Sequence, residues 1–398
     1  MNRRLLMLST SYPLRAGMDA GVFVQRLAEN LPATWQVEVV CPADQHETPG
    51  TVDPSGVALT PVRYAPAAWR TIAQRPGGIL PAVRTRPWRL ALVPALLAGL
   101  AWTTARRARH ADLIHGNWAL CGVIAGVVGL ALRKPVVTTL RGEDVSGAGG
   151  SVLGRFVISL VMRLSSQVVC VSQAMAEALR ARHPARAGTI HVCLNGVEAT
   201  FSAVPPVTLA DDQAPVFLMV GSLIRRKGVD LAIRALARQS HAERARLLVA
   251  GDGPERAQLE VLAHELGIAA HVQFIGAVAP DQVPAVLAQG HVYVMASRSE
   301  GRPNVVLEAL AAGRAVISTR LPGVAGLVED GDTGWLCELD SVEALAAAMA
   351  EAIADPAECR RRGGRARAFA KEQLPDWPTA ARCHAAAFDA ALEHTAGR

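Results

Sequence analysis

The chain lacks the cysteine spacing and the long apolar runs that mark metal-binding, secreted or membrane-spanning proteins. Its seven cysteines form no Cys-x-x-Cys pair and several lie in apolar runs, so we expect buried, reduced thiols in a cytoplasmic protein. The apolar stretch Leu5–Leu8 is too short for the core of a signal peptide. Of two longer apolar runs, residues 90–101 are interrupted by Pro94, and residues 118–132 fall short of the roughly 18 that span a bilayer. The sequence therefore predicts no convincing transmembrane helix.

Lysine is scarce, and charge is unevenly distributed along the chain. Only 3 of the 41 basic residues are lysines. Residues 1–200 hold 21 basic and 11 acidic residues, a net charge of +10, whereas residues 201–398 hold 20 and 24, a net charge of −4. The basic first half predicts an anionic partner, for which nucleic acid, an anionic membrane surface and a lipid phosphate are the alternatives.

The composition and the apolar pattern predict an α/β protein with two domains. An apolar content of 51% over 398 residues is enough for two buried cores and excludes a disordered chain. In the first half, short β-like runs alternate with helical patterns, which is typical of a parallel sheet covered by helices on both faces. Residues 42–87, rich in proline and glycine, are expected to be an irregular insertion. The expected strands are 4–9, 36–41, 112–115, 135–140 and 167–171, and the expected helices are 21–31, 90–108, 118–132, 151–164 and 173–182.

A second alternating series follows residues 199–215, a proline-containing segment that we expect to be a linker. Two Rossmann-like domains, residues 1–198 and 216–378, are therefore predicted. The expected strands of the second domain are 215–221, 246–250, 271–275, 291–295 and 315–318, and its expected helices are 229–238, 254–266, 281–288, 341–354 and 356–372.

The stretch from 299 to 318 carries the strongest chemical signal. Glu300 and Glu308 stand eight positions apart, and a proline suited to the first turn of a helix lies between them. We expect a helix that begins at about Pro303 or Asn304 and ends at Gly313, a favourable C-terminal cap. Its first N–H groups would face a phosphate, and Glu308 could accept hydrogen bonds from a sugar hydroxyl. This pattern predicts a site for a phosphorylated sugar such as a nucleotide sugar.

Several motifs together resemble those of a known family. Residues from Glu300 to Glu308, with the Glu-Ala-Leu-Ala-Ala-Gly that starts at Glu308, resemble the Glu-x7-Glu signature of the family 4 retaining glycosyltransferases. The other motifs also fall in the order expected for that family. They are Val220-Gly221-Ser222-Leu223 with Arg226-Lys227-Gly228-Val229-Asp230, Gly251-Asp252-Gly253-Pro254-Glu255, Val272-Gln273-Phe274-Ile275-Gly276 and Asp332-Thr333-Gly334.

The resemblance implies the GT-B fold, in which two Rossmann-like domains face each other across a cleft. The last helix, here about 379–398, would pack back on the first domain. It also implies a retaining transfer of a sugar from a UDP- or GDP-sugar to a glycan or lipid-linked acceptor in polysaccharide or glycolipid biosynthesis, with no cofactor and no metal required. The partner of the basic half would then be an anionic membrane surface and not nucleic acid, and the enzyme would be peripheral on the inner face of the membrane.

The resemblance also assigns the donor-binding residues. Lys227 would bind the diphosphate, as its rarity in the sequence supports, because an ammonium is a compact phosphate ligand. Ser222 stands where the family has an arginine, so we expect Arg225 or Arg226 to supply that cation. Glu308 would accept hydrogen bonds from the ribose, and Glu300 would lie near the transferred sugar. Further donor contacts are expected from Gly221, Gly253, Ile275, Gly276, Gly301, Arg302, Pro303, Asn304 and Val305.

Three residues of the first domain complete the expected site. Gly21 precedes a helix and could bring backbone amides close to the donor phosphate. His115 is placed at a strand end, facing the cleft. Arg141 replaces the histidine of the family's Thr-x-His-Gly-x-Asp motif, which favours a permanent cation near phosphate or an anionic acceptor. The expected catalytic residues are Glu300, Lys227, Arg226, His115 and Arg141.

Two segments allow more than one interpretation. Arginines and tryptophans flank the apolar part of residues 84–109, which fits a helix in a membrane interface; the alternative is a core helix with solvated basic ends. Asp330-Gly331-Asp332 resembles the Asp-x-Asp metal motif of other glycosyltransferases, but the nearby glycines indicate a turn.

Two other functions stay open at this point. One is a sugar-nucleotide epimerase or hydrolase on the same fold, and the other is a non-catalytic, nucleotide-binding subunit at a membrane surface. A nicotinamide dehydrogenase is disfavoured, because the loop after the first strand lacks Gly-x-Gly-x-x-Gly.

Overall fold

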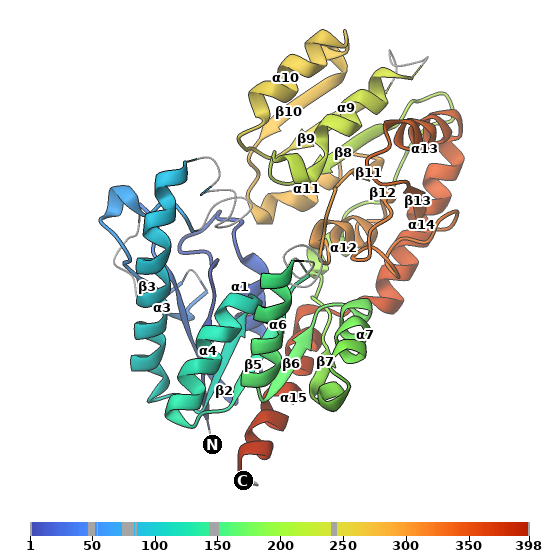
Figure 1. Ribbon diagram of the computed structural model, residues 1–398. Helices are drawn as coiled ribbons and strands as arrows, with labels where there is room; N and C mark the ends of the chain where they lie inside the picture. The colour runs from blue at the N-terminus through green and yellow to red at the C-terminus, as the bar shows by residue number, and fades with distance from the viewer. Residues whose placement is uncertain are drawn as a thin grey trace. The chain divides into compact units, whose positions relative to one another are not determined.

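The chain forms two compact units, each built on one parallel sheet (Figure 1). The computed structural model describes residues 2–46, 52–53, 55–73, 83, 86–142, 151–239 and 245–396. Unit 1 comprises Met1–Gly196 and Trp377–Arg398, and unit 2 comprises Val197–Asp376. The two units are described separately below.

Unit 1 contains seven strands and the helices that cover them. Its strands are β1 Arg3–Leu8, β2 Trp35–Pro42, β3 Ala58–Val62, β4 Leu113–Asn117, β5 Val136–Leu140, β6 Gln167–Cys170 and β7 Ile190–Val192. Its α-helices are α1 Val22–Asn30, α3 Leu92–Ala108, α4 Trp118–Leu132, α6 Val152–Leu164, α7 Gln173–Arg182 and α15 Trp377–Ala396. Short 3-10 helices are η1 Ala67–Trp69, η2 Pro87–Ala91 and η4 Pro184–Thr189.

The sheet of unit 1 has the order β3-β2-β1-β4-β5-β6-β7, and both faces are covered. Successive side chains of a strand point to opposite faces. Leu5 and Met7 of β1 accordingly pack with α1 and α15, whereas Leu6 and Leu8 pack with α3 and α4. Strand order reverses between β1 and β4, and in such sheets ligands bind beyond the carboxyl ends of the strands at this point.

Unit 2 repeats this plan with six strands. They are β8 Val216–Val220, β9 Arg246–Ala250, β10 Val272–Gly276, β11 Val292–Met295, β12 Ala315–Thr319 and β13 Gly334–Cys337. Its α-helices are α8 Ala199–Ser202, α9 Val229–Ala237, α10 Arg256–Glu265, α11 Val283–Leu287, α12 Asn304–Ala311, α13 Val342–Ala354 and α14 Pro356–Gln373. The 3-10 helices are η5 Arg225–Lys227, η6 Ala269–His271 and η7 Pro280–Gln282.

The sheet of unit 2 has the order β10-β9-β8-β11-β12-β13, with the reversal between β8 and β11. Phe217 and Met219 of β8 pack on the side of α9 and α13, and Leu218 packs on the side of α11, α12 and α14. The α/β, two-domain Rossmann-like prediction is confirmed.

The expected strands and helices lie within two residues of the observed ones, but three strands were not expected. These are β3, β7 and β13, and each stands at the edge of its sheet. Edge strands have one neighbour and short apolar runs, so their sequence signal is weak. β3 also contains Pro61, which is tolerated at an edge, and it lies in the segment 42–87 that was expected to be irregular.

The segment 199–215, expected to be a linker, belongs instead to unit 2. Phe201 and Val204 are buried in the core beside α12 and α14, and Leu209 is buried on the other side of the sheet. The prolines of this segment therefore shape an ordered part of the unit.

The last helix, α15, is part of unit 1, where a disulfide ties it to the sheet. Cys383 of α15 is bonded to Cys193, which follows β7, with a Cα–Cα distance of 5.7 Å. This corrects the expectation that all cysteines are reduced. The partners are 190 residues apart, so no local spacing could reveal the pair. The ring of Phe388 also packs against Trp35 at 5.4 Å.

We predict that Cys383→Ser lowers the free energy of unfolding by about 2–4 kcal/mol under non-reducing conditions, because the bond restricts the unfolded chain. In excess reductant the wild type and the variant should unfold alike, which serves as the internal control. Thiol titration of the denatured wild type should find the five free cysteines before reduction. Titration of all seven without reductant would contradict the bond.

Candidate functional site

The loops beyond β8 and β11 bring together the central residues of the expected donor site. Lys227 lies in η5 after β8, and Glu300 lies after β11. The Lys227 Nζ donates to Glu300 Oε1 at 2.6 Å, and the Arg226 guanidinium lies 3.3 Å from Oε2. Ser297 Oγ also donates to Oε1 at 3.0 Å. Two loops that are about 70 residues apart in sequence thus form one charged cluster.

Glu300 is ionised in this cluster although it is only 9% exposed. Burial opposes its charge, but the positive charges of Lys227 and Arg226 and the hydrogen bonds from Lys227 and Ser297 outweigh that effect and lower its pKa. Either Arg225 or Arg226 was expected to supply the cation that Ser222 lacks. Arg226 faces Glu300, whereas the Arg225 side chain is exposed. Arg226 is therefore the arginine placed to accompany Lys227.

Close backbone contacts hold these loops at the strand ends. Gly228 has φ 66°, and a Cβ there would lie 1.9 Å from the Ala296 carbonyl oxygen, so only glycine fits. Gly221 donates its N–H to Ala250 O at 2.9 Å, and Leu223, after Ser222, donates to Asp252 O at 2.9 Å beside Gly253. Gly276, after Ile275, accepts from Gly251 N at 2.7 Å. Gly221, Ser222, Gly253, Ile275 and Gly276 therefore lie along the carboxyl ends of β8, β9 and β10.

Arg298 braces the same loops and was not identified from the sequence. Its guanidinium donates to both oxygens of Asp230 at 2.9 and 2.8 Å and to Asp340 at 2.6 Å. It also donates to the Arg225 carbonyl oxygen at 2.6 Å, and its own N–H donates to Arg226 O at 2.7 Å. Arg298 therefore fixes the position of η5, which carries Lys227. No spacing rule marks this residue, because its partners are distant in sequence.

Helix α12 carries the second acidic residue of the motif. Gly301, Arg302 and Pro303 lead into the helix, and Asn304 and Val305 are its first two residues. No side chain caps this end. At the other end Arg314 N donates to Ala309 O and Gly313 N to Leu310 O, both at 2.9 Å, which is the expected glycine cap.

Glu308 differs from Glu300 in its electrostatic surroundings. Its side chain is half-buried, and burial, followed by the nearby charge of Glu198, raises its pKa from 4.5 to about 7. Tyr293 of β11 lies near both carboxylates and donates to Val220 O at 3.4 Å. Near neutral pH Glu308 can therefore exist in either protonation state.

This shift predicts a pH-dependent cost to folding. Because the pKa of Glu308 is higher in the folded than in the unfolded protein, its contribution to stability is lost as pH rises from 4.5 through about 7. Glu308→Gln cannot ionise, so its stability relative to wild type should increase between pH 5 and pH 8, as measured by urea midpoints. Glu265→Gln, at an exposed glutamate of α10, is the control. A Glu308→Gln difference that does not change with pH would contradict the shift.

His115 does not occupy the strand end at which it was expected. β4 continues to Asn117, which places His115 in the strand interior with no exposed surface. Its Nε2 is 2.8 Å from Thr139 Oγ1, and its ring packs against Phe388 of α15 at 5.0 Å. Burial, then the charges of His384 and Arg141, hold its pKa well below the ordinary value. It therefore belongs to the neutral core of unit 1.

Arg141 forms a buried cluster at the carboxyl ends of β4 and β5. Its guanidinium donates to Asn117 Oδ1 at 2.8 Å and to Asn195 Oδ1 at 3.1 Å, and it lies over the ring of Phe23 at 4.5 Å. Trp118 beside it has φ 67°, which is strained for a bulky residue and is found mainly at functional sites. Asn117, Trp118 and Phe23 were not identified from the sequence.

Gly21 lies at the start of α1, in the same unit as Arg141. It has φ 82°, and a Cβ there would lie 2.3 Å from Ser11 O, so glycine is required. Glu143 and Asp144, the end of the motif that contains Arg141, lie outside the described residues.

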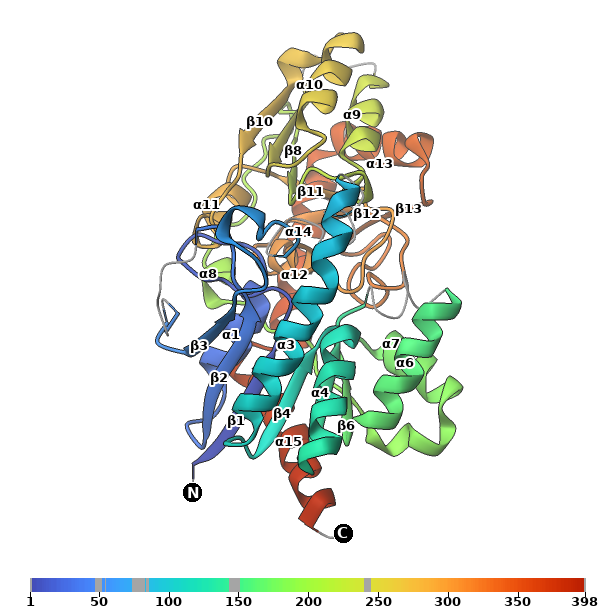
Figure 2. The same cartoon turned by 60° about the vertical axis from the view of Figure 1, so that its left-hand side comes forward.

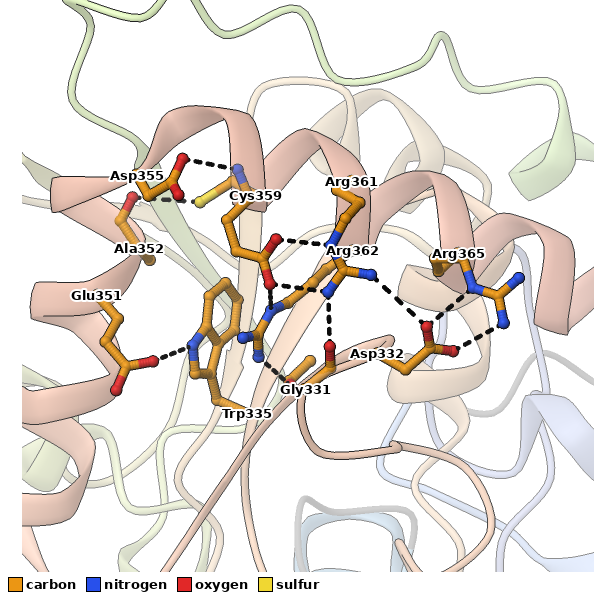
Figure 3. A network of polar contacts seen from close by, with 12 residues as sticks. Gly331, Asp332, Trp335, Glu351, Ala352, Asp355, Cys359, Arg361, Arg362 and Arg365 are labelled. Carbon is orange, nitrogen blue, oxygen red and sulfur yellow. Dashed lines mark hydrogen bonds and ion pairs between the residues drawn. The ribbon is translucent and has the colours of Figure 1, made fainter.

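The Asp330-Gly331-Asp332 segment joins an arginine network on α14 (Figure 3). Asp332 accepts from Arg365 at 2.8 and 3.1 Å and lies 3.7 Å from Arg361. Arg361 also donates to Gly331 O at 2.6 Å, and Arg362 lies over the ring of Trp335 at 3.9 Å. Asp332 thus joins this turn to α14. The described residues contain no group of three or more His, Cys, Asp or Glu placed to hold a metal ion.

Comparisons with known proteins assign the family. The model described as Glycosyltransferase Family 4 matches residues 20–201, and that described as Glycosyl transferases group 1 matches residues 201–369. The chain belongs to the family 4 glycosyltransferases. It is 28% identical to a glycogen synthase of Mycobacterium tuberculosis over 98% of this chain and 95% of that protein. A match of 37% to the lipopolysaccharide core biosynthesis glycosyltransferase LpsE of Rhizobium meliloti covers 36% of this chain and 40% of the relative.

Solved structures show the same fold for this glycosyltransferase. A sucrose-phosphate synthase from Thermosynechococcus elongatus has a TM-score of 0.77 at 22% identity, covering 97% of this chain and 98% of that one. Anabaena Alr3699/HepE, solved in complex with UDP and glucose, has a TM-score of 0.73 at 20% identity, covering 97% and 99%. The fold is GT-B, as the sequence resemblance implied.

Proposed function

We propose that this glycosyltransferase transfers a sugar from a nucleoside-diphosphate sugar to a glycan or lipid-linked acceptor, with retention of configuration and without a metal ion. The observation that supports this most directly is the cluster of Lys227, Arg226 and Glu300 at the switch point of the unit 2 sheet. Two cations beside one carboxylate leave a positive centre that can hold a diphosphate. The UDP bound in the HepE structure supports this class of donor.

Lys227 and Arg226 would stabilise the charge that develops on the diphosphate as the glycosidic bond breaks. Fixed ammonium and guanidinium groups can supply the positive charge that a metal ion supplies in other transferases. Glu308 would accept hydrogen bonds from the ribose, and the amides of residues 301–305 would contact the sugar or the phosphate. In unit 1, Arg141 would meet an anionic group of the donor or acceptor. The acceptor would attack on the face that the leaving phosphate departs from, which retains the configuration.

Lys227→Ala should lower turnover of the sugar nucleotide by about 100-fold or more, because one charge-stabilising donor is removed. It should also abolish the rise in melting temperature that UDP or GDP induces. At 100 times Kd this ligand would add about 2.7 kcal/mol to the free energy of unfolding of the wild type. Lys371→Ala, at an exposed lysine of α14, is the matched control and should behave as wild type. Wild-type binding and turnover by Lys227→Ala would reject the site, and turnover without any acceptor would favour a hydrolase or epimerase.

We also propose that unit 1 meets an anionic membrane surface through η2 and α3. Within the described part of the chain, one helical segment, Pro87–Ala108, is long and apolar enough to cross a membrane by length and composition alone. Helix α3 lies beside α4 in unit 1 (Figure 2). Its buried face carries Leu92, Leu96 and Leu100, which recur at helical spacing. Trp88, Leu90 and Trp102 are instead 50%, 63% and 73% exposed. These exposed side chains fit a lipid interface better than a core helix with solvated ends.

The charge around this surface suits anionic lipid. Residues 54–111 contain no Asp or Glu, and Arg86, Arg106 and Arg109 are exposed. Arg89 is buried and Arg107 is paired with Glu38 at 3.1 Å. These two arginines therefore add less positive charge to the surface than the sequence suggested. Arg84 lies outside the described residues.

Wild type should co-sediment with vesicles containing phosphatidylglycerol and should bind phosphatidylcholine vesicles much less. Trp88→Ala combined with Trp102→Ala should reduce that binding by about tenfold or more, because two interfacial anchors are lost. Leu339→Ala, at an exposed apolar residue of unit 2, is the control. Equal binding of both vesicle types by wild type and double variant would contradict this surface.

A further inference from the structure

Arg302 differs from Arg314 and Arg298 of unit 2 in having neither a hydrogen-bond partner nor a counter-charge among the described residues. Its Nε is buried and has no hydrogen-bond partner among the described residues. Its two terminal nitrogens are accessible, and neither forms an ion pair or a hydrogen bond with a described residue. Arg314, which is also buried, donates to the carbonyl oxygens of Leu287, Pro205 and Ala312. Arg298 is held by two carboxylates. Burial lowers the pKa of Arg302 to about 10.

Arg302 lies in the segment that connects the charged cluster with α12. It is two residues after Glu300 and two before Asn304, the first residue of the helix. The backbone of this segment packs closely against Gly323, where a Cβ would lie 2.3 Å from Gly301 O and 2.7 Å from Glu300 O. The guanidinium is thus carried by a backbone that is held firmly where the transferred sugar is expected.

The terminal nitrogens of Arg302 are accessible and have no partner among the described residues, so they can donate to an anionic group of a ligand. The diphosphate has Lys227 and Arg226 for this purpose. A neutral hexose offers only hydroxyls, whereas a carboxylate matches the planar fork of a guanidinium with two charge-assisted hydrogen bonds. The accessible, unpartnered guanidinium of Arg302 is therefore complementary to an acidic group on the sugar itself.

We propose that Arg302 binds a carboxylate of the transferred sugar, so that the donor is a nucleoside-diphosphate uronate. This inference rests on the proposed donor site and adds the class of sugar to it. Arg302 is then a specificity-determining residue: its side chain distinguishes a C6 carboxylate from the C6 hydroxymethyl of the neutral sugar.

The test compares donors that differ only at C6, with nucleotides alone as the reference. Calorimetry measures the affinity for UDP-glucuronate, UDP-galacturonate and GDP-mannuronate, for the matching UDP-glucose, UDP-galactose and GDP-mannose, and for UDP and GDP. The proteins are wild type, Arg302→Leu and Arg302→Lys. The control is Arg320→Gln, which removes an exposed charge from the same unit.

Wild type should bind one uronate about 10- to 100-fold more tightly than its neutral counterpart. Arg302→Leu should lose that preference while its affinity for UDP or GDP stays unchanged, Arg302→Lys should keep part of it, and Arg320→Gln should keep all of it. Leucine removes a half-buried charge that has no counter-charge among the described residues and keeps the apolar stem, so the variant should fold as stably as wild type.

Each other outcome overturns the inference in a recognisable way. Equal affinity of wild type for uronates and neutral sugars rejects the sugar assignment and leaves the donor site intact. An equal loss of affinity for UDP or GDP alone in Arg302→Leu shows that Arg302 binds phosphate instead. Failure of every nucleotide and nucleotide sugar to bind wild type rejects the donor site, and this inference with it.

Discussion

The contact between Glu300 and the Lys227–Arg226 pair joins the two loops on which the proposed donor site of unit 2 depends. These loops leave two neighbouring strands, β8 and β11, at the point where strand order reverses. The carboxylate neutralises part of two adjacent positive charges that would otherwise repel each other. Arg298 adds a second link between the same loops through Asp230 and the backbone of Arg225 and Arg226. The cations are therefore already in place before any ligand arrives, which limits the reorganisation that binding requires.

The sequence predicted what local chemistry controls, and it missed what depends on distant partners. Apolar runs bounded by glycine and proline located the central strands and α12, because burial on both faces demands such runs. Of the four edge strands, β10 was predicted and β3, β7 and β13 were not: β3 contains Pro61, and β7 and β13 have only 3 and 4 residues. Arg298 was not identified for another reason. An arginine within Ser-Arg-Ser has no distinguishing pattern, and only the fold brings Asp230 and Asp340 within hydrogen-bonding distance of it. The Cys193–Cys383 bond is the extreme case of this dependence on distant partners.

His115 and Arg141 show how a small error in a strand boundary changes a functional assignment. The apolar pattern of β4 stops at Ile114, so a polar residue at 115 looked like the strand end. The strand runs on through Gly116 and Asn117, and a neutral histidine bonded to Thr139 is acceptable in the core. The strand end is taken by Asn117, which holds the Arg141 guanidinium beneath the rings of Phe23 and Trp118. The polar group that the sequence placed at His115 is thus supplied two residues later.

The two acidic residues of the motif have opposite electrostatic environments, although they stand on one short stretch of chain. Lys227 and Arg226 keep Glu300 ionised, so it can position cations but cannot release a proton near neutral pH. Glu308, which burial and Glu198 push toward the protonated form, can donate as well as accept a hydrogen bond. Under the proposed function, Glu308 would meet the ribose hydroxyls in either protonation state, whereas the diphosphate would need the fixed positive charge that Glu300 positions. Residues whose surroundings drive their pKa values apart commonly divide roles in this way, so the two acidic residues of the motif would divide charge placement from sugar recognition under the proposed function.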